Sequence, residues 1–414
     1  MTERTPTGWG SDKATECLSL GMGLKQIDNF NELLLNFYPG DPKTYNPCSG
    51  LRAWTYETST EYEFSSYARY WHGHAEIIRW LVLATGIPIA RSILWIVMFI
   101  LIFCLWLVVQ ASLRKCSKRP QVIATFTVGI YAYFSGLSDL HSSMTHLLSE
   151  ISILFIALLS YKILGSKPRG RIMIYGFTMG GAYVCTSYMI NPQSIPVAIL
   201  VWATIPIVLR TRELKKAILN SIVLISSLVV GFICLWVTKW LLIWATGSYD
   251  IWTDVRSQAL HRSSHSVNSL SDGVGKHLES FRNLPAFLQA ILANVAALLS
   301  KIYDPRYSSD FLLIFYLITA MSFAIFVTWK WRTTATHFDF TKFDHLANGV
   351  LLIWISSLSL VMFWYIFLTQ HSFDHATYTY RSLAIGISGI PMVLASLFGH
   401  ENVQNEKSLY DARY

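Results

Sequence analysis

Residues 89–112 read IARSILWIVMFILIFCLWLVVQAS, a run in which Arg91 is the only charged side chain. A helix needs about 20 mostly apolar residues to cross the hydrocarbon of a bilayer. The chain has 414 residues, of which 53% are hydrophobic and only 14% are charged, and this composition is too apolar for an ordinary soluble domain. The sequence therefore predicts an all-α, polytopic transmembrane helix bundle.

The chain contains further apolar runs of similar length, separated by loops. With the first run they predict about nine spans, at 89–112, 121–138, 148–164, 172–190, 193–209, 217–245, 309–328, 346–369 and 380–398. The count becomes ten if the mostly apolar stretch 283–305 also crosses the membrane. The basic loop that follows the seventh run argues against this alternative, because a tenth span would move that loop to the other side.

The short loops between these runs are of two kinds. Strongly basic loops are LRKCSKR (113–119), SKPRGR (166–171), RTRELKK (210–216) and WKWR (329–332). Loops without Lys or Arg are LHSSMTH (140–146), Asn191–Pro192 and HSFDH (371–375). Because cytoplasmic loops carry an excess of Lys and Arg, we expect the basic loops in the cytoplasm and the others on the outer face of the cell membrane. The net charge of +8 then reflects topology, and no nucleic-acid partner is expected.

This topology divides the chain into five parts. They are an outer N-terminal segment (1–88), a first transmembrane block (89–245), an outer loop (246–308), a second transmembrane block (309–398) and a cytoplasmic tail (399–414). The first part is polar and has no apolar region of a signal peptide, so we expect a further transmembrane helix upstream of it. The alternative is a long tail translocated without a signal.

Two stretches of the outer parts have the pattern of helices that lie on a membrane surface. AEIIRWLVLATGIP (75–88) and 283–305 are amphipathic or mostly apolar, and both end in turn residues. We expect these interfacial helices to roof an outer cavity, in contact with membrane lipids.

Two of the six cysteines, Cys17 and Cys48, fall in the outer N-terminal segment, where an oxidising compartment would let them pair. Cys104, Cys185 and Cys234 are expected to be membrane-buried apolar fillers. The six show no metal-binding spacing, so no cofactor is predicted, and assistance by a divalent metal is left open.

Arginine and histidine recur in the segments expected on the outer face. Candidate binding residues are Arg69, His72 and His74 in YARYWHGHAEIIR (67–79), Arg262 in ALHRSSHS (259–266), and His371, His375, Tyr378 and Arg381 in QHSFDHATYTYR (370–381). Arginine binds phosphate through two parallel hydrogen bonds, so these residues predict a phosphate site. The plainer interpretation is that the arginines snorkel among interfacial aromatic residues.

The last of these stretches predicts the most specific arrangement. If 370–381 continues helically into the final span, then His371, His375, Tyr378 and Arg381 follow each other at spacings of four, three and three residues. Such spacings place side chains on one stripe of a helix. The stripe would present two imidazoles, a phenol and a guanidinium to an anionic lipid phosphate at interfacial depth.

Acidic residues of the N-terminal segment are candidates for a general base. Asp12 and Glu16 are four apart and share one face of a helix, and Glu57, Glu61 and Glu63 cluster further on. The alternative is that these acids are solvated surface residues. The chain has no usable G-x-S-x-G, H-E-x-x-H, P-loop or dinucleotide-binding motif, which leaves hydrolases, metalloproteases and nucleotide-driven motors without their signatures.

The runs YARYWHGHAEIIRWL, GFICLWVTKWLLIWATG with the later ALHRSS, and HSFDHATYTYRSLA resemble bacterial polytopic membrane proteins of the GT-C glycosyltransferase class. The resemblance extends from about residue 12 to 398. It implies a polyprenyl-phosphate-linked sugar donor, a glycan or other acceptor on the outer face, and a catalytic acid in the first outer loop. Asp12 matches that acid, with Glu16 as the alternative. The chain departs from the class in lacking a first helix before this loop.

Three other functions fit parts of the pattern. A polysaccharide polymerase or ligase would use the same donor and the same face. A transporter would need charged or broken helices near the midplane, where Lys239 is the main candidate, because we expect Glu150 and Lys162 to reach the interface. A non-catalytic membrane scaffold would leave the outer arginines and histidines without a common purpose.

Overall fold

The computed structural model describes residues 13–25, 27–40, 47–56, 62–114, 117, 119–140, 143–187, 191–264, 283–299 and 345–398. Several of the residues and segments singled out above lie outside these ranges: Asp12, Glu57, Glu61, His265, the WKWR loop, the expected span 309–328 and the tail 399–414.

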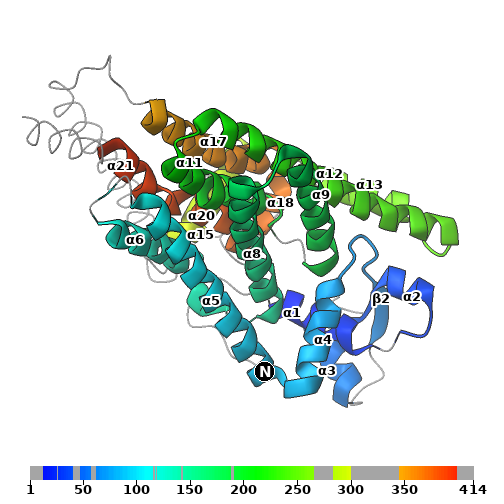
Figure 1. The fold of residues 1–414 in the computed structure, drawn as a ribbon. Coiled ribbons are helices and arrows are strands. Elements are labelled where there is room, and N and C mark those ends of the chain that lie inside the picture. The colour runs from blue at the N-terminus through cyan, green and yellow to red at the C-terminus, as the bar shows by residue number, and fades with distance from the viewer. Residues whose placement is uncertain are drawn as a thin grey trace, which may run out of the picture.

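Helices make up nearly all of the described chain (Figure 1). In the first half these are α1 (Lys13–Leu24), α2 (Phe30–Leu35), α3 (Pro47–Tyr56), α4 (Gly73–Thr85), α5 (Ile87–Leu113), α6 (Pro120–Phe134), α7 (Leu137–Leu140), α8 (Met144–Ser166) and α9 (Arg169–Thr186). In the second half these are α10 (Ser194–Ala198), the π-helix η1 (Ile199–Thr204), α11 (Ile205–Thr211), α12 (Leu214–Thr246), α13 (Ile251–Ser263), α15 (Ala286–Leu299), α17 (His345–Phe367), α18 (Thr369–Asp374), α19 (Ala376–Thr379), α20 (Arg381–Ser388) and α21 (Ile390–Phe398). Strands β1 (Phe37–Gly40) and β2 (Glu63–Ser66) pair antiparallel.

Five of the described helical segments are long and apolar enough to cross a membrane: Ile87–Leu113, Met144–Ser166, Ser194–Thr211, Leu214–Thr246 and His345–Phe367. Each coincides with one of the expected runs, so the prediction of an all-α protein with membrane-spanning helices is confirmed at this level. The helices α6, α9 and α20 with α21 coincide with three further runs and are shorter or less apolar. The count of nine spans therefore stays a prediction.

The expected continuous helix through 370–398 is wrong. The chain turns after α18, after α19 and again between α20 and α21, where Pro391 cannot donate the backbone hydrogen bond that a continuous helix needs. Side chains satisfy carbonyl groups near these breaks: Asn191 donates to the carbonyl of Tyr378 (2.8 Å) and Tyr365 to that of Thr379 (3.1 Å). The backbone carbonyl groups near the breaks thus keep hydrogen-bond partners although the helix is interrupted.

Contacts between helix termini distinguish two ends of the bundle. At one end, the Arg210 guanidinium donates to the Tyr161 hydroxyl (3.0 Å), which joins the last turns of α11 and α8 beside two basic loops. At the other end, the carbonyl of Ser135 after α6 accepts from Arg381 at the start of α20 (3.1 Å), and Trp236 in the second half of α12 donates to the carbonyl of Arg69 (2.7 Å). We call this second end the site end, because the candidate residues gather there.

The N-terminal helices α1–α4 form the blue region at the lower right of Figure 1, and α13 extends from α12 above them, toward the right edge of the same view. A disulfide joins Cys17 of α1 to Cys48 of α3, as the sequence analysis expected. Cys234 is exposed on α12 and Cys104 and Cys185 are partly exposed, and their burial in the membrane stays a prediction.

The helices expected on the membrane surface are α4 and α15. In α4, His74, Ala75 and Ile78 are buried and Trp80 is 67% exposed, which is an amphipathic distribution. Helix α15 packs against α18 and α19, where Asn294 donates to the carbonyl of Ser372 (2.9 Å). Contact of either helix with lipid stays a prediction.

Helices α9 and α12 approach each other at backbone distance through glycines. A Cβ placed on Gly180 would lie 2.0 Å from the carbonyl oxygen of Leu228, and one on Gly231 would lie 2.1 Å from that of Phe177. Close helix pairs of this kind use small residues because their backbones then meet without side chains between them.

Candidate functional site

Arg381 lies at the centre of a buried polar network at the site end. Its Nη1 donates to Nδ1 of His146 (2.9 Å) and its Nε donates to the carbonyl oxygen of Ser135 (3.1 Å). The carboxylate of Glu150 lies 4.0 Å from Nε and accepts a hydrogen bond from the Tyr131 hydroxyl (2.9 Å). We call these five residues the arginine network.

Both charged residues of this network are buried within the protein. Arg381 and Glu150 are each 1% exposed, and their depth in the membrane stays a prediction. A buried charge is tolerated when an opposite charge and hydrogen bonds compensate it, which the network supplies to both residues. A direct contact of Arg381 with phosphate stays untested.

The three aromatic residues expected on one stripe do lie next to one another. The rings of His371 and His375 are 4.7 Å apart, and those of His375 and Tyr378 are stacked at 4.9 Å. The Tyr378 ring then meets the ring of His146 edge to face at 5.6 Å. This aromatic row, His371, His375, Tyr378 and His146, connects the surface of α18 to the arginine network.

Helix α13, which carries Arg262, packs against α18, which carries His371 at the other end of the aromatic row. The Arg262 guanidinium stands over the Tyr70 ring, 5.7 Å from the ring centre. Burial lowers the pKa of His371 well below its usual range, and the nearby His375, Arg262 and His261 lower it further. His371 is therefore neutral at pH 7, and its buried Nδ1 has no hydrogen-bond partner among the described residues.

Arg69 is held in an ion pair with Asp254 of α13, with 2.7 Å between the two side chains. Its carbonyl oxygen accepts hydrogen bonds from Trp236 (2.7 Å) and Trp240 (3.1 Å), and the buried Lys239 donates to the neighbouring carbonyl of Tyr70. These contacts fix the loop before α4 on the last turns of α12. The predicted phosphate contact of Arg69 is untested, and its present partner is a carboxylate.

His72 and His74 are buried and hydrogen-bonded within the N-terminal segment. His72 Nε2 lies 3.0 Å from the carbonyl of Tyr67, and His74 Nε2 lies 3.0 Å from the hydroxyl of Ser19. Burial lowers the pKa of His74 to about 3, and burial with the nearby Lys239 and His74 lowers that of His72 well below its usual range. Both imidazoles are therefore neutral at pH 7, and neither supplies positive charge to a phosphate.

Acidification is expected to destabilise the protein through His74. The unfolded chain binds a proton on this residue near pH 6.5, whereas the folded protein does so only near pH 3. Stability is complete above pH 6.5 and falls as the pH drops toward 3, by about 2 kcal/mol at pH 5. Thermal unfolding in nanodiscs at pH 7.5 and 5 measures the loss.

His74→Gln is expected to remove about one proton equivalent from this pH dependence. His345→Gln, at an exposed histidine at the start of α17, is the matched control and is expected to keep the dependence of the unmodified protein. Equal pH dependence in all three proteins would contradict the assignment to His74.

Glu16 caps the N-terminus of α8. Its carboxylate accepts hydrogen bonds from the Ser143 hydroxyl, the backbone N–H groups of Met144 and Thr145, and the Thr145 hydroxyl, each at 3.1 Å. Arg91 approaches it at 3.7 Å. Three of these donors lie on Oε2 and one on Oε1, so both carboxylate oxygens are engaged. Glu16 thus holds α1 against α8, and its predicted role as a general base stays untested.

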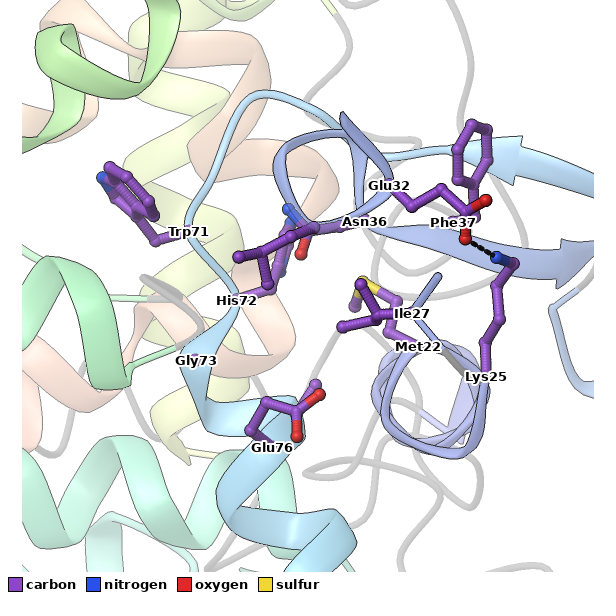
Figure 2. Close-up of a pocket in the computed structure, with 12 residues that line it drawn as sticks. Met22, Lys25, Ile27, Glu32, Asn36, Phe37, Trp71, His72, Gly73 and Glu76 are labelled. Atoms are coloured by element: carbon purple, nitrogen blue, oxygen red, sulfur yellow. Dashed lines mark hydrogen bonds and ion pairs between the residues drawn. The ribbon is translucent and has the colours of Figure 1, made fainter. Parts of the chain in front are cut away.

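A pocket between α1, α2 and the start of α4 is shown in Figure 2. Lys25 and Glu32 form an ion pair at its rim, 2.5 Å apart, and His72 and Trp71 line its inner side. Its cavity volume of about 60 Å³ is small beside the usual range for ligand pockets, about 300–1,000 Å³. The pocket is therefore not the candidate site. Among the described residues, no group of three His, Cys, Asp or Glu side chains is placed to hold a metal ion.

Sequence reasoning missed His146, Tyr131 and the interior position of Glu150. One signal was available: an acidic residue within an apolar run is by default a functional or paired residue. A second was the Ser143 hydroxyl, which accepts a hydrogen bond from the backbone N–H of His146 (3.4 Å) and marks the start of a helix that brings His146 to the site end.

Comparison with known proteins adds no assignment: no protein-family model matches the chain, and no curated protein or solved structure matches it significantly.

Proposed function

We propose that this protein is a membrane glycosyltransferase that moves a sugar from a polyprenyl-phosphate-linked donor to a glycan or other acceptor. The observation that carries the proposal is the packing of α13, which carries Arg262, against α18, whose His371 adjoins His375 and Tyr378. These residues come from chain segments far apart in sequence and meet at the site end of an apolar helix bundle.

A lipid-linked donor makes three demands on its enzyme. The phosphate needs donors at the edge of the membrane, the prenyl chain needs apolar helix surface beside them, and the sugar needs access to an acceptor in water. Arg262 supplies a guanidinium whose charge persists at any physiological pH. The neutral His371 supplies a hydrogen-bonding nitrogen, Nδ1, that has no partner within the described part of the chain. Such groups would stabilise the charge that develops on a departing phosphate.

The orientation of the site end toward the outside has two supports. The described basic loops lie at the opposite end, as cytoplasmic loops do, and the Cys17–Cys48 disulfide belongs to an oxidising compartment. Nine spans with an extracytoplasmic site fit this arrangement. An acid to activate the acceptor comes from the N-terminal segment in this proposal, and Asp12 is favoured because the carboxylate of Glu16 already accepts four hydrogen bonds from the start of α8.

Transport is the second candidate, and the buried charges of Glu150, Arg381 and Lys239 favour it. Glu150 and Arg381 compensate each other, and Lys239 is bonded to a backbone carbonyl of the loop before α4. These contacts account for the three charges structurally, so we prefer transfer.

Arg262→Ala is expected to weaken lipid-phosphate binding and sugar transfer by roughly 10- to 100-fold, because a charged hydrogen bond contributes about 1.5–3 kcal/mol. Arg262→Lys should restore part of this, since a point charge lacks the planar fork. Protein in nanodiscs is titrated with farnesyl phosphate, and release of polyprenyl phosphate is followed with a panel of polyprenyl-phosphate sugars.

The matched control is Arg256→Ala, which removes an exposed arginine from the same helix. It should leave binding and transfer unchanged. Equal activity of the Arg262 and Arg256 variants would contradict the proposed site, and transfer from no donor in the panel with accumulation of a solute in vesicles would favour transport.

A further inference from the structure

The hydrogen bond between Arg381 and His146 determines where the imidazole carries its proton. A guanidinium has only donors, so His146 Nδ1 must accept from Arg381 Nη1 at 2.9 Å. A proton on Nδ1 would place two N–H groups against each other. His146 is therefore neutral with its single proton on Nε2.

The Nε2–H of His146 is a buried donor that no described residue accepts from. His146 is 1% exposed, and Nε2 has no hydrogen-bond partner among the described residues. Its neighbours leave little freedom to the ring: Arg381 holds Nδ1, and the Tyr378 ring lies edge to face with it. An unpaired buried donor lowers the stability of the fold by about 1–3 kcal/mol. We therefore expect a donor that is oriented in this way to bind an acceptor from outside the protein.

We propose that His146 Nε2–H binds a phosphate oxygen, and that Arg381 and Glu150 are positioning residues that keep this donor neutral and aimed. The inference rests on the proposed function, because it adds a hydrogen-bond donor at the inner end of the aromatic row to the phosphate that Arg262 would bind.

The chemistry of the surroundings favours an anionic oxygen over a hydroxyl. Hydrogen bonds to charged acceptors are about twice as strong as those between neutral groups. A neutral N–H also binds an anion without adding a second positive charge beside Arg381, whose own charge Glu150 already compensates. An imidazolium in this position would be repelled by the guanidinium.

Two substitutions of His146 distinguish the role of its Nε2–H donor from that of its Nδ1 acceptor. The side-chain oxygen of Asn can replace Nδ1 as the acceptor for Arg381, but His146→Asn has no donor at Nε2. The amide nitrogen of Gln reaches the Nε2 position, so His146→Gln keeps the donor. We expect His146→Asn to weaken farnesyl phosphate binding in nanodiscs by roughly 10- to 100-fold and His146→Gln to restore most of it.

A measurement on the unmodified protein does not depend on the folding of variants. With ¹⁵N-labelled histidine, the Nε2–H resonance that is absent from His146→Asn should shift on addition of farnesyl phosphate and stay in place with farnesol. Inorganic phosphate is the third probe: a shift with phosphate alone identifies a free anion rather than a lipid headgroup as the ligand, and overturns the lipid assignment.

The outcomes distinguish this inference from the proposed function. If the unmodified protein and His146→Asn bind farnesyl phosphate equally, or the resonance does not move, the role of His146 is wrong and the glycosyltransferase proposal stands. If the unmodified protein does not bind farnesyl phosphate at all, the proposed function itself is wrong.

Discussion

Arg381→Ala is expected to destabilise the protein by about 3–5 kcal/mol, because it leaves Glu150 charged and buried without its cation. Loss of the Ser135 and His146 contacts adds to this effect. Thermal unfolding in nanodiscs measures the change. Arg171→Ala, at an exposed arginine at the start of α9, is the control and is expected to lie within about 0.5 kcal/mol of the unmodified protein.

The double variant Arg381→Met with Glu150→Gln tests the cause. It removes both charges and keeps similar side-chain volumes, and replacing a buried ion pair in this way is often neutral. We expect it to recover most of the stability lost in the single variant. If the double variant is as unstable as Arg381→Ala, the unpaired charge of Glu150 is not the cause of the destabilisation.

Gly180→Leu is expected to have a comparable effect, of about 3 kcal/mol or more, by separating α9 from α12. The first added atom would already lie 2.0 Å from the carbonyl oxygen of Leu228, and a backbone atom cannot move away as a flexible side chain can. The measurement is the fraction of monodisperse protein after extraction, together with its unfolding temperature.

Gly129→Ala is the matched control for this prediction. Gly129 lies within α6, and a Cβ added there meets nothing within 4 Å. Alanine is the better helix former by about 1 kcal/mol, so this variant is expected to be as stable as the unmodified protein or slightly more so. Similar losses in both variants would contradict close packing as the reason.

The long apolar helices could be predicted from the sequence because length and hydrophobicity alone decide them. The run 89–112 became α5, and 217–245 became α12, each with boundaries within a few residues. The breaks in 370–398 could not be predicted in this way. They depend on partners such as Asn191 and Tyr365, whose side chains satisfy carbonyls near the breaks.

The candidate site was predictable as a set of residues and not as a geometry. His371, His375 and Tyr378 adjoin as their spacing indicates, because spacings of three and four survive a local turn. The position of Arg381 was ambiguous, since an arginine near the end of an apolar run can snorkel outward or pair inward. Its partner His146 is 235 residues away in sequence, and no local pattern indicates it.

The small residues of GFTMGG at 176–181 carried a usable signal. Gly176 and Gly180 are four apart within an apolar run, the spacing by which helices in membranes approach closely. The role of Glu16 could not be predicted, because an acid on a short N-terminal helix is expected to be solvated. Its four hydrogen-bond donors come from the start of α8, which is distant in sequence.

The separation between His146 and Arg381 also has a consequence for biosynthesis. At about 5–20 residues per second, the ribosome needs roughly 12 to 47 seconds to synthesise the 235 residues between them. During this delay the nascent chain holds Glu150 with Tyr131 but without its cation. Insertion of α20, which carries Arg381, is then the step that supplies this cation, so newly made chains that stop short of residue 381 would carry a carboxylate without its partner that membrane quality control can recognise.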